Sequence, residues 1–251
     1  MQVIVVGRDP GRAEEARRFI RTRAPGAEID TALADFASLD AVRGLAADIL
    51  ARYDRIDVLV NNAGLICPRL AQSADGYELT IAVNHLAPFL LTSLLLDRLE
   101  GSAPARIVTV ASVAHRGARL DPATMTHPPE WTPLSAYGRS KLANILFTHA
   151  LARRLDPARV TACCLHPGVI ATDIGNHAGT LAAIGWRIAR LVLPGPNKGA
   201  RSSVFLATVS DPTPFHGAYV IGRAIAEPDA AARDDRLGEA LWQESARLVG
   251  L

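Results

Sequence analysis

The chain has 251 residues, of which 49% are hydrophobic and 21% are charged, proportions that are typical of a globular protein and exclude a disordered one. The net charge of +2, with no Lys/Arg run interleaved with aromatic residues, argues against a nucleic-acid partner. The length favours a single domain over residues 1–251.

Strand and helix patterns alternate along the whole chain. In chain order we expect strands at Val3–Val6, 27–36, 56–64, 105–112 and 159–168, helices at 11–24, 39–53, 80–99, 135–155 and Leu181–Leu193, and a long loop over Arg116–Pro133. Alternating elements with nearly unbroken apolar strands predict an α/β fold, namely a doubly wound parallel sheet covered by helices on both faces.

Candidate binding residues follow the predicted strands. In open parallel sheets, ligands bind outside the carboxyl ends of the strands. The residues that come directly after strands here are Arg8, Asp35, Asn61–Gly64, Ser112 and Pro167–Thr172. We therefore expect a binding site where these residues meet.

The cysteines and the apolar stretches bear on metal binding, on the cellular compartment and on membrane insertion. The three cysteines have no metal-ligand spacing, so we expect no metal site, and the adjacent Cys163 and Cys164 should be buried free thiols in a reducing cytoplasm. Arg8 and Asp9 arrive before an apolar signal region is complete, so no signal peptide is expected. The apolar stretch Leu86–Leu96 is too short to span a bilayer.

Tyr137 and Lys141 are four residues apart on one predicted helix and therefore share a face. An ammonium beside a phenol favours the phenolate and lowers the tyrosine pKa, which would let Tyr137 exchange a proton with a substrate oxygen. Taken alone, the pair is equally compatible with an ordinary Tyr and Lys on one helix face.

Three further polar features each have a structural and a functional interpretation. Ser112 ends a strand, where its hydroxyl could bind a carbonyl substrate or form a strand-end turn. Asn84 lies in an apolar helix, where a buried amide needs partners and could serve helix packing or a site. The small residues of Asn61–Gly64 would let a flat ligand approach the backbone.

Together these segments resemble the short-chain dehydrogenase/reductase family from Val3 to Leu251. N-N-A-G, the helix Asn, the strand-end Ser, Y-x-x-x-K and P-G-x-x-x-T occur in the family's order. The long separation of Ser112 from Tyr137, with "SVAH", "AYGRSKLANILFTHALARRL", "LHPGVIATDI" and the terminal "LWQESARLVGL", is similar to the retinol-dehydrogenase-like branch.

The resemblance implies roles for the matching positions. Tyr137 would be the general acid in reduction and the general base in oxidation, and Lys141 would lower its pKa and hold the nicotinamide ribose. Ser112 would polarise the substrate carbonyl, and Asn84 would anchor a water in a proton relay. The other implied cofactor-binding residues are Asp35 at the adenine, Asn61, Ala63 and Gly64 along the cofactor, and Pro167, Gly168, Ile170 and Thr172 near the carboxamide.

Arg8 indicates the cofactor. The resemblance makes the strand before "GRDP" the family's second strand, where a basic residue favours the extra phosphate of NADP and an acidic one favours the ribose hydroxyls of NAD. Asp9 follows Arg8 directly, so a surface Arg in a turn is the alternative. The expected cofactor is NADP(H).

The same alignment of motifs implies that the printed sequence lacks the family's first strand, its T-G-x-x-x-G-I-G turn and its first helix. Gly7 and Gly11, with Arg8, Asp9 and Pro10 between them, do not replace that turn. Without the central strand, its neighbours would either separate or pair directly, and the cofactor phosphates would lose backbone donors. Either the real start codon lies upstream, which we favour because every catalytic position is present in kind, or the chain is a cofactor-poor relic. We expect residues 1–251 alone to fold poorly or bind NADPH weakly.

These features predict an oxidoreductase that interconverts a ketone or aldehyde with an alcohol. A lid at about 174–197, with Trp186 among aliphatic residues, suggests a bulky apolar substrate such as a retinoid, steroid or polyketide ketone. Its Arg187 and Arg190 make membrane contact a lesser possibility, and the two long apolar helices could pair in a homodimer. The alternative function is a non-catalytic binding or dimerisation partner.

Overall fold

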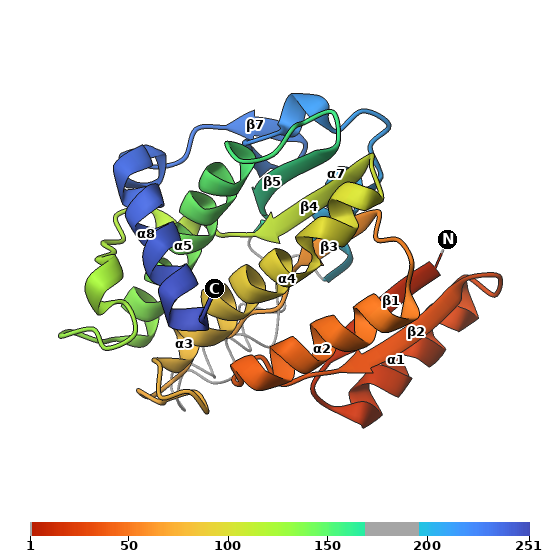
Figure 1. Ribbon diagram of the computed structural model, residues 1–251, viewed down its shortest axis with the longest axis horizontal. Helices are drawn as coiled ribbons and strands as arrows, with labels where there is room; N and C mark the ends of the chain where they lie inside the picture. Colours follow the sequence, from red (N-terminus) through yellow and green to blue (C-terminus); the bar gives the residue numbers. More distant parts are fainter. Residues whose placement is uncertain (1, 169–195) are drawn as a thin grey trace.

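The computed structural model describes residues 2–168 and 196–251, whose strands form two separate sheets (Figure 1). The strands are β1 (Gln2–Gly7), β2 (Glu28–Leu33), β3 (Val58–Asn61), β4 (Ala105–Val110), β5 (Val160–His166), β6 (Tyr219–Ile221) and β7 (Ala224–Ala226). The α-helices are α1 (Pro10–Arg23), α2 (Leu39–Arg52), α3 (Leu79–Ile81), α4 (Ala87–Gly101), α5 (Pro133–Ala152), α7 (Pro196–Thr208) and α8 (Asp235–Val249).

The larger sheet has the order β3-β4-β5-β6-β7 and forms the centre of the molecule. Strands β3 to β6 are parallel, and β7 pairs antiparallel with β6 at the edge. Alternate side chains of β4 enter different layers, since Ile107 joins the cluster with α4, α5 and α8 whereas Val108 joins the cluster with Leu206 of α7. The predicted parallel sheet with helices on both faces is confirmed, because both faces of β4 are covered.

The smaller sheet consists of β1 and β2 in parallel register. It packs with α1 and α2, and α2 in turn packs on α4. Strands β1 and β3 are not hydrogen-bonded to each other, so of the two arrangements expected from the sequence, separation rather than direct pairing is observed. The single doubly wound sheet is therefore replaced, in the described residues, by a pair of strands and a sheet of five.

Capping residues explain where the main helices begin and end. Asp9 accepts a hydrogen bond from the Arg12 backbone at the start of α1, and Pro10 follows it. Thr132 and Ser135 form a reciprocal capping box at the start of α5. Helix α8 ends at Gly250, whose φ of 70° is a conformation that glycine adopts without strain.

A helical run of 23 residues from Leu79 to Gly101 crosses the core. It joins α3, the π-helical segment Ala82–Leu86 and α4, and is therefore longer than the apolar stretch Leu86–Leu96 suggests. Within the described residues it is the one helix long and apolar enough to cross a membrane, but 78% of its most apolar window is buried inside the chain. We therefore interpret this run as a core helix.

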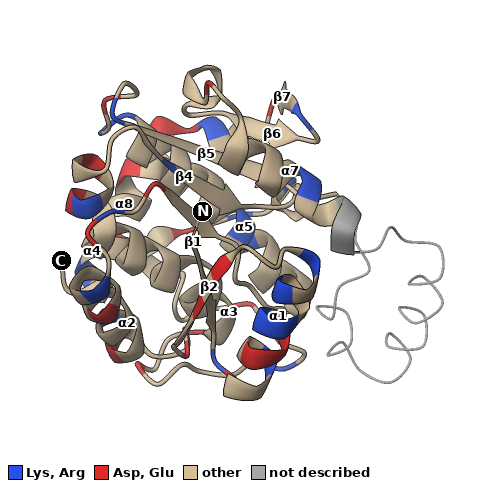
Figure 2. Ribbon diagram, turned by 90° about the vertical axis from the view of Figure 1, so that its right-hand side faces the viewer, with Lys and Arg blue, Asp and Glu red and all other residues tan. Residues whose placement is uncertain are grey.

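Charged side chains are spread over the outer helices, and both signs occur on α1 and α2 (Figure 2). The two predicted thiols, Cys163 and Cys164, are free and buried, as expected. Helices α4 and α5 are buried mostly within this same chain, so their pairing in a homodimer stays a prediction. The helix expected at Leu181–Leu193 lies outside the described residues, as do residues 174–195 of the lid expected at about 174–197; its last two residues begin α7.

Candidate active site

Helix α5 lies unusually close to the segment after β4, and a glycine makes this possible. A Cβ atom at position 138 would lie 2.8 Å from the carbonyl oxygen of Ala114, closer than real side chains approach backbone. Ser112 lies two residues after the end of β4, just before this segment, and Tyr137 precedes Gly138 on α5. The close approach therefore brings together two residues that the sequence predicts for one site.

The Ser112 hydroxyl lies close enough to the Tyr137 phenol to act on its pKa. Burial raises the pKa of the Tyr137 phenol, and the Ser112 hydroxyl offsets only part of this rise. Tyr137 is consequently a protonated phenol at neutral pH. Ser112 also accepts a hydrogen bond at 3.2 Å from the Ala114 backbone, so the turn interpretation of this serine is observed, and its contact with a carbonyl substrate stays a prediction.

Lys141 occupies a different position from the one expected. Its side chain is 3% exposed, and Nζ donates a 2.9 Å hydrogen bond to the Val110 carbonyl oxygen. Nζ is 5.6 Å from the centre of the Tyr137 ring. Burial lowers the pKa of Lys141 to about 8. The pKa of Tyr137 is raised, so the expected lowering by Lys141 is not found here, and the ammonium is bound to a backbone carbonyl instead.

Asn84 lies in the π-helical segment Ala82–Leu86. Its side chain donates 2.9 Å bonds to Ser140 Oγ and the Leu65 carbonyl and accepts a 2.8 Å bond from the Leu65 backbone. Both amide donors are therefore used inside the protein, which supports the packing interpretation.

The small residues after β3 contact this same cluster. A Cβ atom at Gly64 would lie 3.4 Å from both Asn84 Oδ1 and Lys141 Nζ, so the glycine leaves space directly against those groups. Ala63 is exposed beside it. Asn61 differs from expectation, because its buried side chain donates to Thr92 Oγ1 at 2.9 Å and faces the core.

Residues of the smaller sheet are exposed at its carboxyl end. Arg8 is exposed after β1, and the Asp9 carboxylate beside it is used as the cap of α1. Asp35 is also exposed, and its Oδ1 accepts a 3.0 Å bond from the Ala37 backbone in the turn after β2.

The last predicted site residues follow β5. Pro167 is half-buried and Gly168 is exposed with a φ of 90°, a conformation that favours glycine. Ile170 and Thr172 lie outside the described residues.

One residue that sequence reasoning missed is His115. Its Nε2 accepts a 3.1 Å bond from the Asp229 backbone, so Nδ1 carries the proton and donates to the Ser112 carbonyl at 2.6 Å. Burial lowers its pKa, which keeps the ring neutral. His115 thereby ties the backbone of Ser112 to a distant loop. The "SVAH" motif contains this residue, but nothing local in it indicates the partner.

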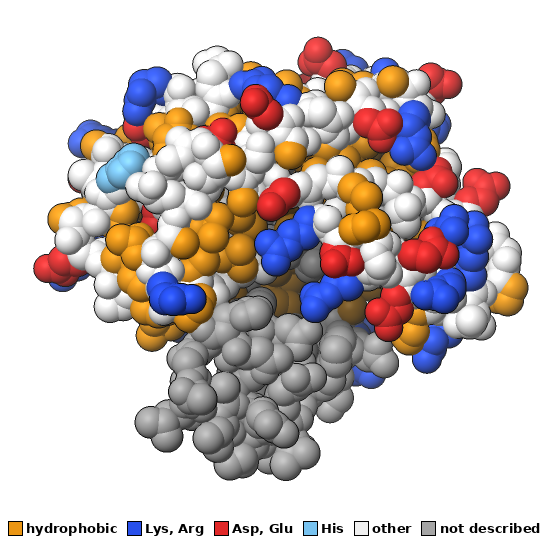
Figure 3. Space-filling view, turned by 90° about the horizontal axis from the view of Figure 1, so that it is seen from below, with side chains coloured by type: hydrophobic (Ala, Val, Ile, Leu, Met, Phe, Trp, Pro, Cys, Tyr) orange, Lys and Arg blue, Asp and Glu red, His pale blue; other side chains and the backbone are white. Residues whose placement is uncertain are grey.

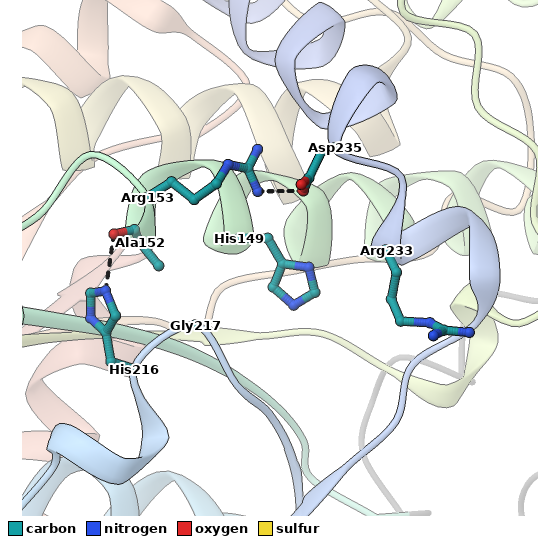
Figure 4. A pocket seen from close by; sticks show the side chains of 7 residues that line it. All are labelled: His149, Ala152, Arg153, His216, Gly217, Arg233 and Asp235. Carbon is teal, nitrogen blue, oxygen red and sulfur yellow. Dashed lines mark hydrogen bonds and ion pairs between the residues drawn. The ribbon is translucent and has the colours of Figure 1, made fainter.

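A surface pocket of about 440 Å³ lies at the opposite end of α5 (Figure 4). Its polar groups are already paired: Arg153 binds Asp235 at 2.7 Å, and His216 is hydrogen-bonded to the Ala152 carbonyl at 2.9 Å. The other lining residues are His149, Gly217 and Arg233. The pocket contains none of the residues described above.

Residues 1–180 match the model of the short chain dehydrogenase family. The chain belongs to this family. It is 38% identical to retinol dehydrogenase 13 of Homo sapiens over 260 aligned residues, which cover 99% of this chain and 77% of that protein. Its oxidoreductase class and its likeness to the retinol dehydrogenases follow from this match.

Two solved structures of similar fold support the assignment. The crystal structure of an uncharacterized protein from Mycobacterium paratuberculosis has a TM-score of 0.76 at 30% identity, covering 99% of this chain and 84% of that one. A short-chain dehydrogenase/reductase of unknown function from Caenorhabditis elegans, solved with cofactor, has a TM-score of 0.70 at 22% identity, covering 88% and 84%.

The short-chain dehydrogenases use NAD(P), and the residues at this site fit such a cofactor. The space at Gly64 lies against Asn84 Oδ1 and Lys141 Nζ, two groups that hydrogen-bond hydroxyls. Lys141, Tyr137 and Gly64 would hold the nicotinamide end of the cofactor. Arg8 directly follows β1 of the smaller sheet.

Proposed function

We propose that this chain is an NADP(H)-dependent oxidoreductase that interconverts a bulky apolar ketone or aldehyde with its alcohol. The observation that carries the proposal is the cluster of Ser112, Tyr137 and Lys141, joined by the close approach of α5 to the end of β4. A phenol, a hydroxyl and an ammonium together suit a reaction in which a carbonyl oxygen gains or loses a proton.

The protein's part in the reaction is to orient the carbonyl and move one proton. The Ser112 hydroxyl donates to the carbonyl oxygen and fixes it beside the Tyr137 phenol. Tyr137 Oη gives its proton to that oxygen in reduction and takes it back in oxidation. A bound nicotinamide cofactor supplies or accepts the hydride at the carbonyl carbon. Because burial raises the pKa of Tyr137, the phenol is protonated at neutral pH, which is the form that reduction requires.

The choice of NADP over NAD rests on Arg8. Its exposed guanidinium follows β1, where it can reach a 2′-phosphate as a charge-assisted partner. The neighbouring Asp9, which could otherwise favour ribose hydroxyls, already accepts a bond from the Arg12 backbone at 2.8 Å. This use of Asp9 removes the main argument for NAD.

An apolar substrate is supported by the surroundings of the site. Val113, directly after Ser112, is 37% exposed, and Leu134, one turn before Tyr137, is 71% exposed. Apolar side chains also gather in a recess of the face seen in Figure 3. The name of retinol dehydrogenase 13, a relative over nearly the whole chain, makes retinoids the first class to test. A steroid or polyketide ketone is the second.

The alternative, a non-catalytic binding partner, is not favoured. Burial of the Lys141 ammonium destabilises the fold, and a non-catalytic binding partner would gain no function from it. The glycines at 64 and 138 also keep space around this group.

The direct test is an assay of the protein with NADPH or NADH and three carbonyl compounds: a retinal, a steroid ketone and acetone. From residues 1–251, which do not contain the family's glycine-rich turn, we expect weak binding of NADPH, turnover of the two large substrates at high NADPH concentration, and little turnover of acetone. Binding of NADPH without turnover of any carbonyl compound would favour the non-catalytic alternative.

A further inference from the structure

A chain of buried polar side chains runs from the active site into the core. Asn144 on α5, His85 in the π-helical segment and Ser245 on α8 are each 2% exposed or less. They lie among Phe89, Phe147 and Trp242, the aromatic rings near His85. Polar groups in such surroundings destabilise the fold unless they are hydrogen-bonded.

One end of this series of buried polar groups is the Val110 carbonyl, which binds Lys141. The Val110 oxygen accepts a 2.9 Å bond from Lys141 Nζ and a 3.3 Å bond from Asn144 Nδ2. Val110 is the last residue of β4, two positions before Ser112. Asn144 therefore contacts the same atom as the buried lysine without belonging to the proposed proton transfer.

The other end is Ser245. His85 Nε2 and Ser245 Oγ are 2.8 Å apart. Burial lowers the pKa of His85 to about 4, and Asn144 is the one neighbour that raises it. The ring is consequently neutral at pH 7 and carries a single N–H.

Two atoms in the middle complement each other. Among the described residues, His85 Nδ1 and Asn144 Oδ1 are both buried and neither has an assigned hydrogen bond. The amide orientation leaves an acceptor at Oδ1, because Nδ2 faces the Val110 carbonyl. Asn144 is close enough to act on the His85 pKa, so with a proton on Nδ1 a small adjustment of the two side chains would satisfy both atoms and leave Nε2 to accept from Ser245.

We propose that His85 and Asn144 are positioning residues for Lys141. The His85 Nδ1–H donates to Asn144 Oδ1, which holds the amide so that Nδ2 shares the Val110 carbonyl with Lys141 Nζ. Without His85, the amide can turn and present oxygen to the Val110 oxygen, which repels it. The effect on catalysis rests on the proposed function, whereas the hydrogen-bond chain itself does not.

The first experiment reads the tautomer directly. In protein with ¹⁵N-labelled histidine at pH 7, without cofactor, we expect the His85 signal to be that of a neutral ring protonated on Nδ1. The signal is assigned by its absence from the His85→Asn spectrum. A ring protonated on Nε2 would overturn the proposal whether or not the protein reduces carbonyl compounds.

The second experiment measures KM for NADPH and kcat. Asn144→Leu and His85→Leu should raise KM for NADPH by about 5- to 20-fold, the scale of one hydrogen bond. His85→Asn, which keeps an amide donor at the Nδ1 position, should restore most of the loss.

Thr148→Val is the matched control, because Thr148 is a buried α5 residue whose hydroxyl donates to the Asn144 backbone carbonyl at 2.8 Å and not to its side-chain amide. It should leave KM unchanged. Equal KM values for His85→Leu and His85→Asn would mean that this series of hydrogen bonds serves core packing alone, and would overturn the proposal. If no carbonyl compound is turned over by the wild type, the NMR result still decides the tautomer, and the proposed function fails separately.

Discussion

The sequences of β1 and β5 both read as apolar strands, but the two strands lie in different environments. All seven residues of β5 are buried, with a hydrogen-bonded strand on each side. No residue of β1 is buried, and its one paired neighbour is β2. The burial of an apolar strand thus depends on its neighbours and not on its own composition.

The same contrast separates the two parts of the proposed function. Ser112, Tyr137 and Lys141 belong to the large sheet and its helix α5, where packing fixes them closely. Arg8 stands at the exposed end of the small sheet. We infer that the large sheet determines the chemistry and the small sheet determines the choice of cofactor, and the following predictions test that division.

The largest effect is expected from Lys141→Met. Loss of the ammonium should reduce kcat/KM by at least about 100-fold, while unfolding measurements should find the variant more stable. Burial lowers the Lys141 pKa from 10.5 to about 8, so the unfolded chain binds more protons between those pH values. The variant's advantage, up to roughly 3 kcal/mol at pH 7, should therefore shrink as pH rises from 8 to 10.5.

The exposed Arg18→Met controls for the loss of a positive charge and should change neither quantity. A Lys141→Met variant that keeps its activity would remove the lysine from the mechanism. A stability advantage that does not depend on pH would show that the lysine is not a buried cation.

Arg8→Ala should change cofactor choice and little else. Loss of a charge-assisted contact of about 1.5–3 kcal/mol should lower the NADPH-over-NADH preference in kcat/KM by roughly 10- to 150-fold. Arg12→Ala, which removes an exposed arginine from the same helix start, is the control and should leave the ratio unchanged. An unchanged ratio in Arg8→Ala would make Arg8 a turn residue only.

Gly138→Ala should weaken the close approach of α5 to β4. Its Cβ would lie 2.8 Å from backbone, so we expect a loss of about 1–3 kcal/mol in unfolding free energy. A Cβ atom at Gly44 in α2 would have no neighbour within 4 Å, so Gly44→Ala should raise the free energy of unfolding by about 0.5–1 kcal/mol. Chemical denaturation of both variants measures the difference, and equal stability would mean that the contact at Gly138 is not tight.

The smallest expected effect is a difference in hydrogen-exchange rate between the two sheets. Backbone amides of β1 and β2 should exchange at least about 10-fold faster than those of β4 and β5, because fewer buried contacts oppose local opening. Peptide-level mass spectrometry resolves the two regions. Equal protection would contradict the difference in environment on which the division rests.

The sequence predicts the elements better than their contacts. The spacing of Tyr137 and Lys141 and the caps Asp9 and Thr132 are local signals, and the helices occur where these signals place them. The separation of β1 from β3 matches one of the two expected arrangements, yet local patterns could not choose between them.

What the sequence could not predict depends on residues far apart in the chain. His115 binds the backbone of Asp229, 114 positions away, and no local pattern indicates that contact. Lys141 binds the Val110 carbonyl instead of lowering the tyrosine pKa, because burial is set by the assembled core. Helical periodicity gives the shared face of the two residues but not the electrostatics around them.

The central claim is that Tyr137 moves the proton of a carbonyl–alcohol reaction, and the most direct measurement is kcat of Tyr137→Phe beside its dissociation constant for NADPH. We predict a fall in kcat of at least about 100-fold, with NADPH binding within a few-fold of wild type. Tyr53→Phe, whose hydroxyl binds Asp30 outside the site, should behave as wild type. A Tyr137→Phe variant with near wild-type turnover would remove Tyr137 from the mechanism and contradict the account.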